Sequence, residues 1–337
     1  MKKVELIFVP ALAMRHLVST VEFAKRLIYR DHRIRVNILS MKWFPIDPKK
    51  SFGPFIKSYI PHVRNAVRDI VLMRCVSGGT RIAGLVLDLF CSPMIDIATD
   101  FSLPSYLFFT SNAAFFGLMC KDRGYTTYVK VVARFKDAKG IIINTFEELE
   151  PYALHCFSNG QNPPLYPVGP VIELTGLSYS DSDDKVMKWL DDQPQASVVF
   201  LCFGSMGSFK TPQVKEIALG LEQSGFRFLW SLRVQPPQND ASEMLPDGFL
   251  KRVQGRGMIC SWAPQLKVLT HKVIGGFISH CGWNSILEIL WFGVPITTWP
   301  LYAEQQLNAF KMVKELGLAV EMRLNYRKDS NEVVVEK

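Results

Sequence analysis

Short apolar segments alternate with amphipathic helical segments along this chain, and the alternation occurs in two successive series. In the first series, apolar segments of a length that suits buried strands span residues 4–10, 35–41, 82–87, 105–109 and 140–144. In the second series they span residues 197–203, 226–232, 258–261 and 276–279. Strands that alternate with helices predict parallel sheets covered by helices on both faces. We therefore expect an α/β protein with two doubly wound, Rossmann-like domains.

A polar segment separates the two series. Residues 159–184 are rich in Pro, Gly, Ser and Asp and lack periodicity, which is typical of a linker. The prediction is an N-terminal domain over residues 1–158, this linker, and a C-terminal domain over residues 185–337, with the two domains facing each other across a cleft. A length of 337 residues agrees with two domains.

Composition excludes several classes of protein. The net charge is +8, but Lys and Arg are scattered through every segment and no nucleic-acid-binding motif accompanies them, so we expect no nucleic-acid partner. Seven cysteines without a C-x-x-C pair indicate reduced thiols and a cytoplasmic protein. No apolar run approaches the roughly 18 residues that a membrane span requires. The sequence gives no indication of the oligomeric state.

Three polar residues follow strands of the first series. His16 follows the first strand, Asp88 ends the strand over residues 82–87, and Thr110 follows the strand over residues 105–109. The carboxyl edge of an open α/β sheet is where ligands bind. An imidazole there can take a proton near neutral pH, and a carboxylate can hold its other nitrogen. The first loop has no G-x-G-x-x-G fingerprint, which disfavours a nicotinamide oxidoreductase.

A glycine-rich turn, Phe203-Gly204-Ser205-Met206-Gly207, follows the first strand of the second series. It either faces a phosphate group or is a plain tight turn. A hydrolase nucleophile elbow would need glycine two residues before the serine, where this chain has Phe203. A serine-hydrolase function is therefore excluded for this turn.

Residues 262–305 have the features of a ligand site. A strand over residues 276–279 is followed by Gly282 and a helix to about residue 292, whose free N–H groups and dipole suit a phosphate. Asn284 and Ser285 either cap that helix or bind a ligand oxygen. Residues 299–302 are expected as a strand, and Glu304 and Gln305 at the next helix start suit a hydroxyl-rich ligand. A zinc site at His280 and Cys281 is disfavoured because no further ligand pair has suitable spacing.

This segment resembles the signature box of plant family-1 UDP-glycosyltransferases. The matching residues, all at the box's spacing, are Trp262, Gln265, His280, Gly282, Trp283, Asn284, Ser285, Glu288, Pro295, Pro300, Glu304 and Gln305. The resemblance extends over nearly the whole chain. It implies a GT-B fold and an inverting transfer of a sugar, usually glucose, from a UDP-sugar to a small acceptor. It also implies that no metal and no cofactor takes part; the sequence Asp181-Ser182-Asp183, which has the form of a metal motif, lies in the expected linker.

The resemblance also implies roles for individual residues. His16 is the expected base and Asp88 its partner. For the UDP-sugar, Trp262 stacks on the uracil, Gln265 and Glu288 hold the ribose, and Ser205, His280, Asn284 and Ser285 hold the phosphates. The sugar contacts Trp283, Glu304 and Gln305, and Thr110 and Ala263 complete the donor set. An acceptor pocket drawn from Phe90, Phe108, Phe115, Phe116 and Met119 suits a flat phenolic compound such as a flavonoid.

Departures from the family pattern leave an alternative open. Arg15 stands before His16, where the family has a small residue, and segments are missing near residues 43–58, between residues 117 and 124, and beyond residue 337. The expected function is glucosylation of a phenolic hydroxyl in plant secondary metabolism. The alternative is a catalytically impaired remnant that binds UDP without transferring sugar.

Overall fold

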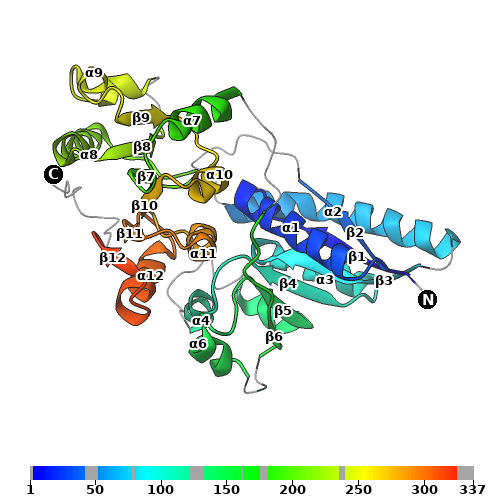
Figure 1. The fold of residues 1–337 in the computed structure, drawn as a ribbon. Coiled ribbons are helices and arrows are strands. Elements are labelled where there is room, and N and C mark those ends of the chain that lie inside the picture. The colour runs from blue at the N-terminus through cyan, green and yellow to red at the C-terminus, as the bar shows by residue number, and fades with distance from the viewer. Residues whose placement is uncertain are drawn as a thin grey trace. The chain divides into compact units, whose positions relative to one another are not determined.

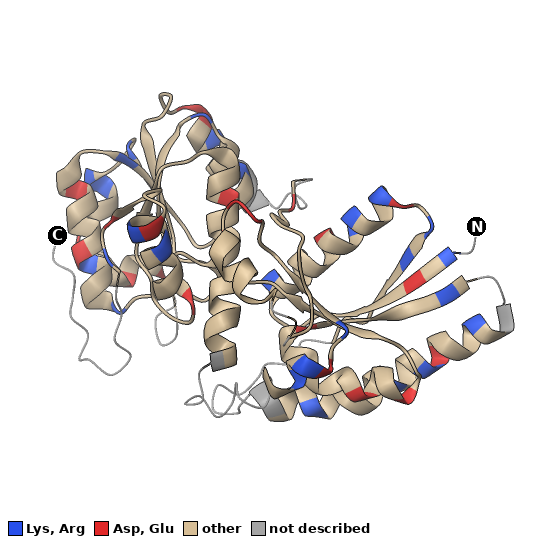
Figure 2. Cartoon of the chain, turned by 90° about the horizontal axis from the view of Figure 1, so that it is seen from below, with Lys and Arg blue, Asp and Glu red and all other residues tan. Residues whose placement is uncertain are grey.

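The computed structural model describes residues 3–41, 52–77, 80–121, 132–158, 160, 162–174, 181–234 and 240–324. The chain forms two compact units, Met1–Glu173 and Leu174–Lys337, and each is described by itself (Figure 1). Lys and Arg are interspersed with Asp and Glu on elements of both units (Figure 2). Within the residues that the structure describes, no helix combines the length and apolarity needed to cross a bilayer.

The first unit contains a six-stranded parallel sheet. In chain order its strands are β1 (Lys3–Val9), β2 (Ile34–Ile38), β3 (Thr80–Asp88), β4 (Ser105–Phe109), β5 (Gly140–Ile143) and β6 (Leu165–Pro167). Their order across the sheet is β2-β1-β3-β4-β5-β6. The direction of winding therefore reverses between β1 and β3, which makes the carboxyl ends of these two strands the ligand-binding position of a doubly wound fold.

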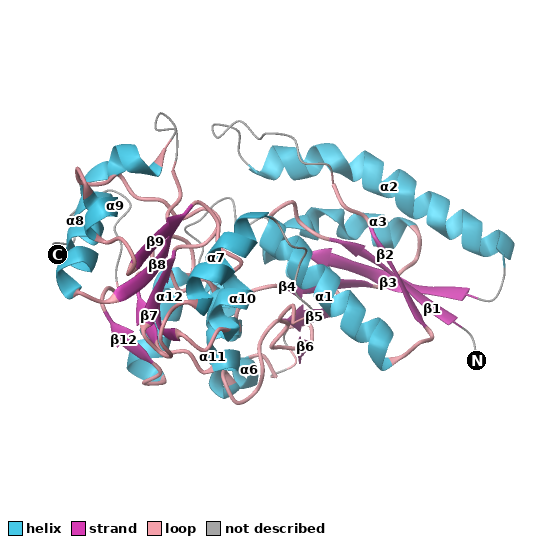
Figure 3. Cartoon of the chain, turned by 45° about the horizontal axis from the view of Figure 1, so that its top comes forward, coloured by secondary structure: helices cyan, strands magenta, loops and turns pink. Residues whose placement is uncertain are grey.

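Helices cover both faces of this sheet (Figure 3). They are α1 (Met14–Arg30), α2 (Phe52–Ser77), the 3₁₀ helix η1 (Leu89–Met94), α3 (Ile95–Asp100), α4 (Ala113–Lys121), the 3₁₀ helix η2 (Arg134–Asp137) and α6 (Pro151–Cys156). Phe8 of β1 packs with Phe23 of α1 in one cluster, whereas Ile7 and Val9 pack with Val63 of α2 in the other. Because successive side chains of a strand point to opposite faces, β1 contributes to both cores.

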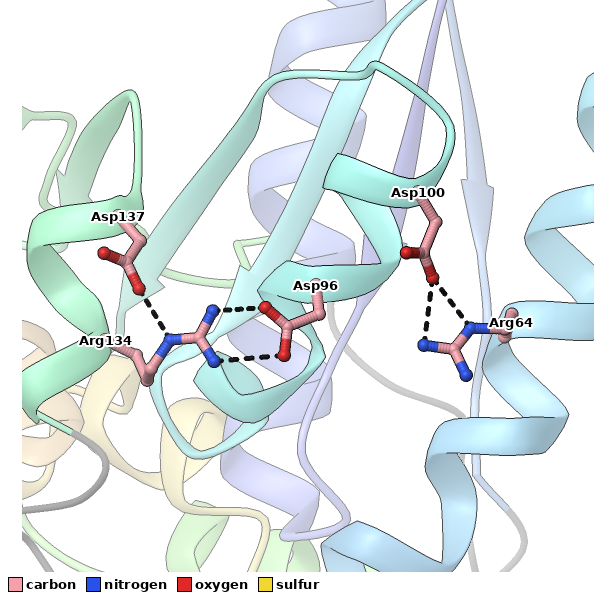
Figure 4. A network of polar contacts seen from close by, with 5 residues as sticks. All are labelled: Arg64, Asp96, Asp100, Arg134 and Asp137. Carbon is pink, nitrogen blue, oxygen red and sulfur yellow. Dashed lines mark hydrogen bonds and ion pairs between the residues drawn. The ribbon is translucent and has the colours of Figure 1, made fainter.

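Charged contacts tie α2 and its neighbours to the unit. The buried Glu5 of β1 accepts hydrogen bonds from Arg74 of α2 at 2.5 and 2.8 Å. Arg64 of α2 pairs with Asp100 of α3 at 2.9 Å, and Arg134 of η2 joins Asp96 and Asp137 (Figure 4). The contacts in Figure 4 are largely exposed and contribute little individually, whereas the Glu5 carboxylate of the other pair is buried and Arg74 is partly exposed.

The second unit repeats the architecture. Its strands are β7 (Val198–Cys202), β8 (Arg227–Ser231), β9 (Gly257–Cys260), β10 (Ile274–Ser279), β11 (Ile296–Thr298) and β12 (Ala319–Glu321). All pairs are parallel, in the order β12-β11-β10-β7-β8-β9, so the winding reverses between β7 and β10. The helical segments are α7 (Asp181–Asp191), α8 (Thr211–Ser224), η3 (Ala241–Met244), α9 (Phe249–Arg252), α10 (Gln265–Thr270), α11 (Trp283–Phe292), α12 (Gln305–Phe310) and the π-helical η4 (Lys311–Glu315).

The predicted pair of parallel-sheet α/β domains is confirmed, but three local expectations are wrong. Residues 159–184, expected as a linker, contain β6, which pairs with β5, and the beginning of α7. Asp181-Ser182-Asp183 accordingly begins a helix. Residues 299–302, expected as a strand, follow the end of β11. These errors arise because a three-residue strand is too short for an apolar pattern, and a Pro-rich segment can still form an edge strand.

Candidate functional site

His16 and Asp88 lie at the switch point of the first sheet. His16 is in the first turn of α1, which follows β1, and Asp88 is the last residue of β3. Nδ1 of His16 lies 2.7 Å from Oδ2 of Asp88, whose other carboxylate oxygen accepts a hydrogen bond of 3.0 Å from the backbone N–H of Phe90. Asp88 is buried and His16 is partly exposed. The expected contact is present, and the carboxylate is itself held in place.

Thr110 and Phe90 complete the surroundings of this imidazole. Oγ1 of Thr110 lies 3.2 Å from Nδ1 of His16, and the rings of His16 and Phe90 are 5.4 Å apart. Thr110, which we expect in the donor set, thus lies beside the His16–Asp88 pair. With the Nδ1 proton donated to Asp88, Nε2 carries the lone pair of the neutral ring. The arrangement can therefore accept a proton at Nε2.

The nearby thiol of Cys91 takes no part in such chemistry. Burial, with the charge of Asp88 adding to it, raises the pKa of Cys91 well above its usual range. Since the thiolate is the reactive form, this cysteine stays a protonated core residue.

His280 lies at the switch point of the second sheet, between two glycines. A Cβ atom on Gly204 would lie 2.6 Å from Nε2 of His280, and a Cβ atom on Gly282 would lie 2.5 Å from it. Gly204 also has a φ angle of +79°. Both glycines are therefore needed for the close approach of two loops to this imidazole.

The first turn of α11 begins directly after His280, Cys281 and Gly282. Gly282 is its N-cap residue and supplies no side-chain cap, and the N–H of Ile286 makes the first helical bond to the Gly282 carbonyl. The N–H groups of the first turn therefore have no intrahelical acceptor. Ser205, in the neighbouring turn after β7, is exposed. Together these groups suit an anion at the carboxyl edge between β7 and β10.

The two residues expected at the ribose, Gln265 and Glu288, are joined to each other and to Ser285, which is expected at the phosphates. Nε2 of Gln265 in α10 donates hydrogen bonds to Oγ of Ser285 at 2.9 Å and to Oε2 of Glu288 at 2.5 Å, both in α11. This brings together three residues that the sequence separates by up to 23 positions. Trp262 begins the loop before α10 with a half-exposed indole, and Ala263 beside it is buried.

Glu304 and Gln305 stand at the start of α12, as expected. The carbonyl oxygen of the buried Gln305 side chain accepts hydrogen bonds from the backbone N–H groups of Leu301 and Tyr302, at 2.9 and 3.0 Å. The two N–H donors fix the orientation of the amide, so Gln305 can offer only its NH₂ group to a ligand. The neighbouring Glu304 carboxylate is able to accept hydrogen bonds.

Two residues missed by sequence reasoning support these loops. Nδ2 of Asn308 donates to the Cys281 carbonyl at 2.9 Å, and the guanidinium of Arg233 lies 4.3 Å from the centroid of the Trp262 ring. Cys281 and Ala303 have φ angles of +62° and +55°, a left-handed conformation that is unfavourable for residues other than glycine. No pattern in the sequence indicates these contacts, because each depends on how neighbouring strands end.

The expected acceptor pocket is largely wrong. Phe108 packs with Phe8 and Phe23 on the opposite face of the sheet, and Phe116 and Met119 are buried in the core. Phe90 and Phe115 remain partly exposed, and Phe90 contacts His16. An apolar stripe on a helix looks the same whether it lines a core or a pocket, which is why the pattern could not separate them. Trp283, expected at the sugar, is also buried.

Comparison with known proteins defines the class. The model of the UDP-glucoronosyl and UDP-glucosyl transferase family matches residues 166–333. The chain is 46% identical to UDP-glycosyltransferase 71K2 of Pyrus communis, over 99% of this chain and 88% of that protein. It is 42% identical to flavonol 3-O-glucosyltransferase UGT71C4 of Arabidopsis thaliana, over 96% and 86%. The chain therefore belongs to the plant family-1 UDP-glycosyltransferases, and it is an enzyme of that class.

A solved structure extends the similarity to the fold. UGT71G1 of Medicago truncatula, complexed with UDP-glucose, matches with a TM-score of 0.87 and 39% identity, over 98% of this chain and 87% of that one. The fold is thus GT-B. The alignment with the Pyrus protein spans 422 residues, whereas this chain has 337, so at least 85 aligned positions have no residue here. This agrees with the two expected internal gaps; residues 42–51 and 122–131, which adjoin them, lie outside the described part of the chain.

Proposed function

We propose that this enzyme transfers glucose from UDP-glucose to a hydroxyl group of a small phenolic plant metabolite, with inversion at the anomeric carbon. The observation that carries the proposal is the His16–Asp88 pair, at 2.7 Å, on the ligand-binding edge of the first sheet. A flavonol 3-O-glucosyltransferase among its relatives and a related structure with UDP-glucose support the acceptor and the donor. Seven cysteines without a C-x-x-C pair favour the cytoplasm as its location.

On the acceptor side, Nε2 of His16 removes the hydroxyl proton as the acceptor oxygen attacks C1 of the sugar. Asp88, held by the Phe90 N–H, stabilises the imidazolium that forms. The new bond to C1 forms on the face opposite the bond that breaks, so one displacement inverts the configuration. A phenolic hydroxyl suits this base because it is more acidic than an aliphatic alcohol.

On the donor side, the bond between C1 and the β-phosphate oxygen breaks and UDP leaves with the electron pair. We propose that the first turn of α11 and His280 stabilise the charge on the phosphates, while Ser205 contacts the diphosphate. Gln265 and Glu288 bind the ribose, Trp262 the uracil, and Glu304 with the Gln305 amide the sugar hydroxyls. We propose that neither a metal ion nor a cofactor takes part.

Two observations favour a second candidate, a UDP-binding protein with impaired transfer. Arg15 directly precedes His16 in the first turn of α1, and at least 85 aligned positions have no residue in this chain. A cation beside the base or an incomplete acceptor pocket would reduce transfer without touching the residues proposed to bind UDP.

Mass spectrometry of reactions with UDP-glucose and a panel of flavonols and simpler phenols tests the proposal. We expect acceptors to gain one hexose, and the anomeric proton coupling of the product to report a β-glucoside from the α-linked donor. UDP-galactose and UDP-glucuronic acid, run in parallel, test the preference for glucose. UDP binding without transfer to any acceptor would establish the second candidate instead.

A further inference from the structure

We propose that Arg233 is a positioning residue for the base of the donor nucleotide, and that it acts through Trp262. The inference rests on the proposed stacking of uracil on Trp262. Arg233 lies outside the signature segment and has no role in the mechanism derived above.

The sheet register brings the two residues together. Ser231 of β8 pairs with Cys260 of β9, and the N–H of Leu232 donates to the Cys260 carbonyl at 2.9 Å, so the pairing continues past the end of β8. Arg233 and Trp262 then follow at the same carboxyl edge. The guanidinium carbon of Arg233 lies 4.3 Å from the centroid of the Trp262 ring.

This contact covers one side of the indole. Trp262 is 48% exposed, so part of its indole remains accessible beside the Arg233 contact. A guanidinium over one face of an indole is favourable by charge–quadrupole attraction and holds the ring in one orientation. The opposite face is then presented, already oriented, to a planar base, which reduces the entropy lost on binding.

The charge of Arg233 is also close to the end of β9. Burial and the neighbouring Cys202 thiol raise the pKa of Cys260 to about 12, and the charge of Arg233 opposes this rise. The guanidinium is therefore close enough to this strand end for its charge to act on Cys260, in agreement with its contact with the Trp262 ring.

A direct contact between Arg233 and the diphosphate would be a different role, and the two roles predict different dependence on phosphate. A residue that orients the base affects uridine, UMP and UDP by the same factor. A residue that binds phosphate affects UDP most and uridine least, since its attraction increases with the charge of the ligand.

Calorimetric titration with uridine, UMP and UDP tests the inference. The proteins compared are wild type, Arg233→Met, Arg233→Lys, Trp262→Leu and the double variant Arg233→Met/Trp262→Leu. We expect Arg233→Met to weaken all three ligands by about two- to fivefold, the range of a partly exposed cation–π contact. Arg233→Lys should recover part of the loss, and the double variant should match Trp262→Leu alone. Arg252→Met, which removes an equal charge from the exposed pair with Glu222, is the matched control.

The outcomes separate the possibilities. A loss that grows from uridine to UDP, or one that persists in the Trp262→Leu background, overturns the positioning role. Unchanged affinities in Arg233→Met also overturn it. If Trp262→Leu itself leaves uridine binding unchanged, the proposed base site fails, independently of Arg233. With a transferable acceptor, the positioning role further predicts a raised KM for UDP-glucose at an unchanged kcat.

Discussion

Nδ1 of His16 lies 2.7 Å from Oδ2 of Asp88 although 72 positions separate the two residues in the chain. The sheet accounts for this proximity. β1 and β3 are parallel neighbours with Val9 opposite Leu87, so both strands end at the same level. Asp88 is the last residue of β3, and His16 lies in the first turn of α1, which follows β1 at the same edge of the sheet. The parallel register therefore places this imidazole and this carboxylate together without any local sequence pattern.

Asp88→Asn should reduce kcat by about 10² to 10⁴, because the amide no longer fixes the His16 tautomer or stabilises the imidazolium. Affinity for UDP should not change, since Asp88 belongs to the first unit and to the acceptor side of the proposed mechanism. Steady-state kinetics and UDP titration on one preparation provide the check. Asp100→Asn removes an exposed carboxylate of the same unit and should leave kcat unchanged; equal losses in both variants would contradict a specific role for Asp88.

Gly204→Ala should reduce kcat/KM by about 10². The added Cβ would lie 2.6 Å from Nε2 of His280 and displace either the glycine-rich turn over residues 203–207 or the imidazole. Gly293→Ala is the matched control. Its φ angle of +66° resembles the +79° of Gly204, but no atom lies within 4 Å of its Cβ position. Both variants should lose about 1 kcal/mol of stability from backbone strain, and only Gly204→Ala should lose UDP affinity.

Glu150→Gln should lower the free energy of unfolding by about 1 to 2 kcal/mol. The buried Glu150 carboxylate accepts hydrogen bonds from the N–H groups of Ala113 and Ala114, at 2.7 and 3.1 Å, and so compensates the N-terminus of α4. Glu148→Gln, at an exposed position two residues earlier, should change stability little. Urea unfolding of the two variants measures the difference, and a similar effect at both positions would rule out the capping role.

Glu5→Gln should remove part of the acid sensitivity of folding. Hydrogen bonding from Arg74 is the main cause that lowers the pKa of Glu5 below 4.5, even though burial opposes it. A carboxyl group whose pKa is lower in the folded state stabilises the fold fully above its unfolded pKa. That contribution decreases as the pH falls from about 4.5 and is lost below the folded-state pKa.

Urea unfolding from pH 7 to pH 3 tests this assignment. Glu5→Gln should cost about 1 to 3 kcal/mol at pH 7 and progressively less at lower pH, because the wild-type pair is then lost as well. Asp69→Asn, at an exposed position of α2, should follow the wild-type curve. A constant difference between Glu5→Gln and wild type across this range would show that the charge of Glu5 does not contribute.

Most strands of both sheets were predictable because each is a short apolar run between turn residues, whereas the three-residue strands β6, β11 and β12 were not. The helix α2 was missed, although Ile56, Val63 and Val67 have helical spacing, because Pro61 lies inside it. In a helix interior, proline removes a hydrogen bond and argues against the assignment. The helix nevertheless forms, and its apolar residues pack in the core while Arg74 pairs with Glu5 of β1.

In the candidate site, too, some features could be predicted from the sequence and others could not. His16 and Asp88 could be chosen because they follow strands, and the residues from Trp262 to Gln305 because their spacing is specific. Thr110 was expected at the same edge as His16, but its contact with Nδ1, the Gln305 amide bound to its own loop, and Arg233 over Trp262 could not be predicted. Each depends on a side-chain direction at a strand end, which no periodicity specifies.

The most direct test of the central claim is hexose transfer from UDP-glucose by wild type and His16→Ala, with UDP affinity measured on the same samples. The account predicts transfer by wild type, a loss of about 10² to 10⁴ in kcat for His16→Ala, and equal UDP dissociation constants. Transfer retained by His16→Ala would contradict His16 as the base. Wild type that binds UDP but transfers no hexose would contradict the proposed activity.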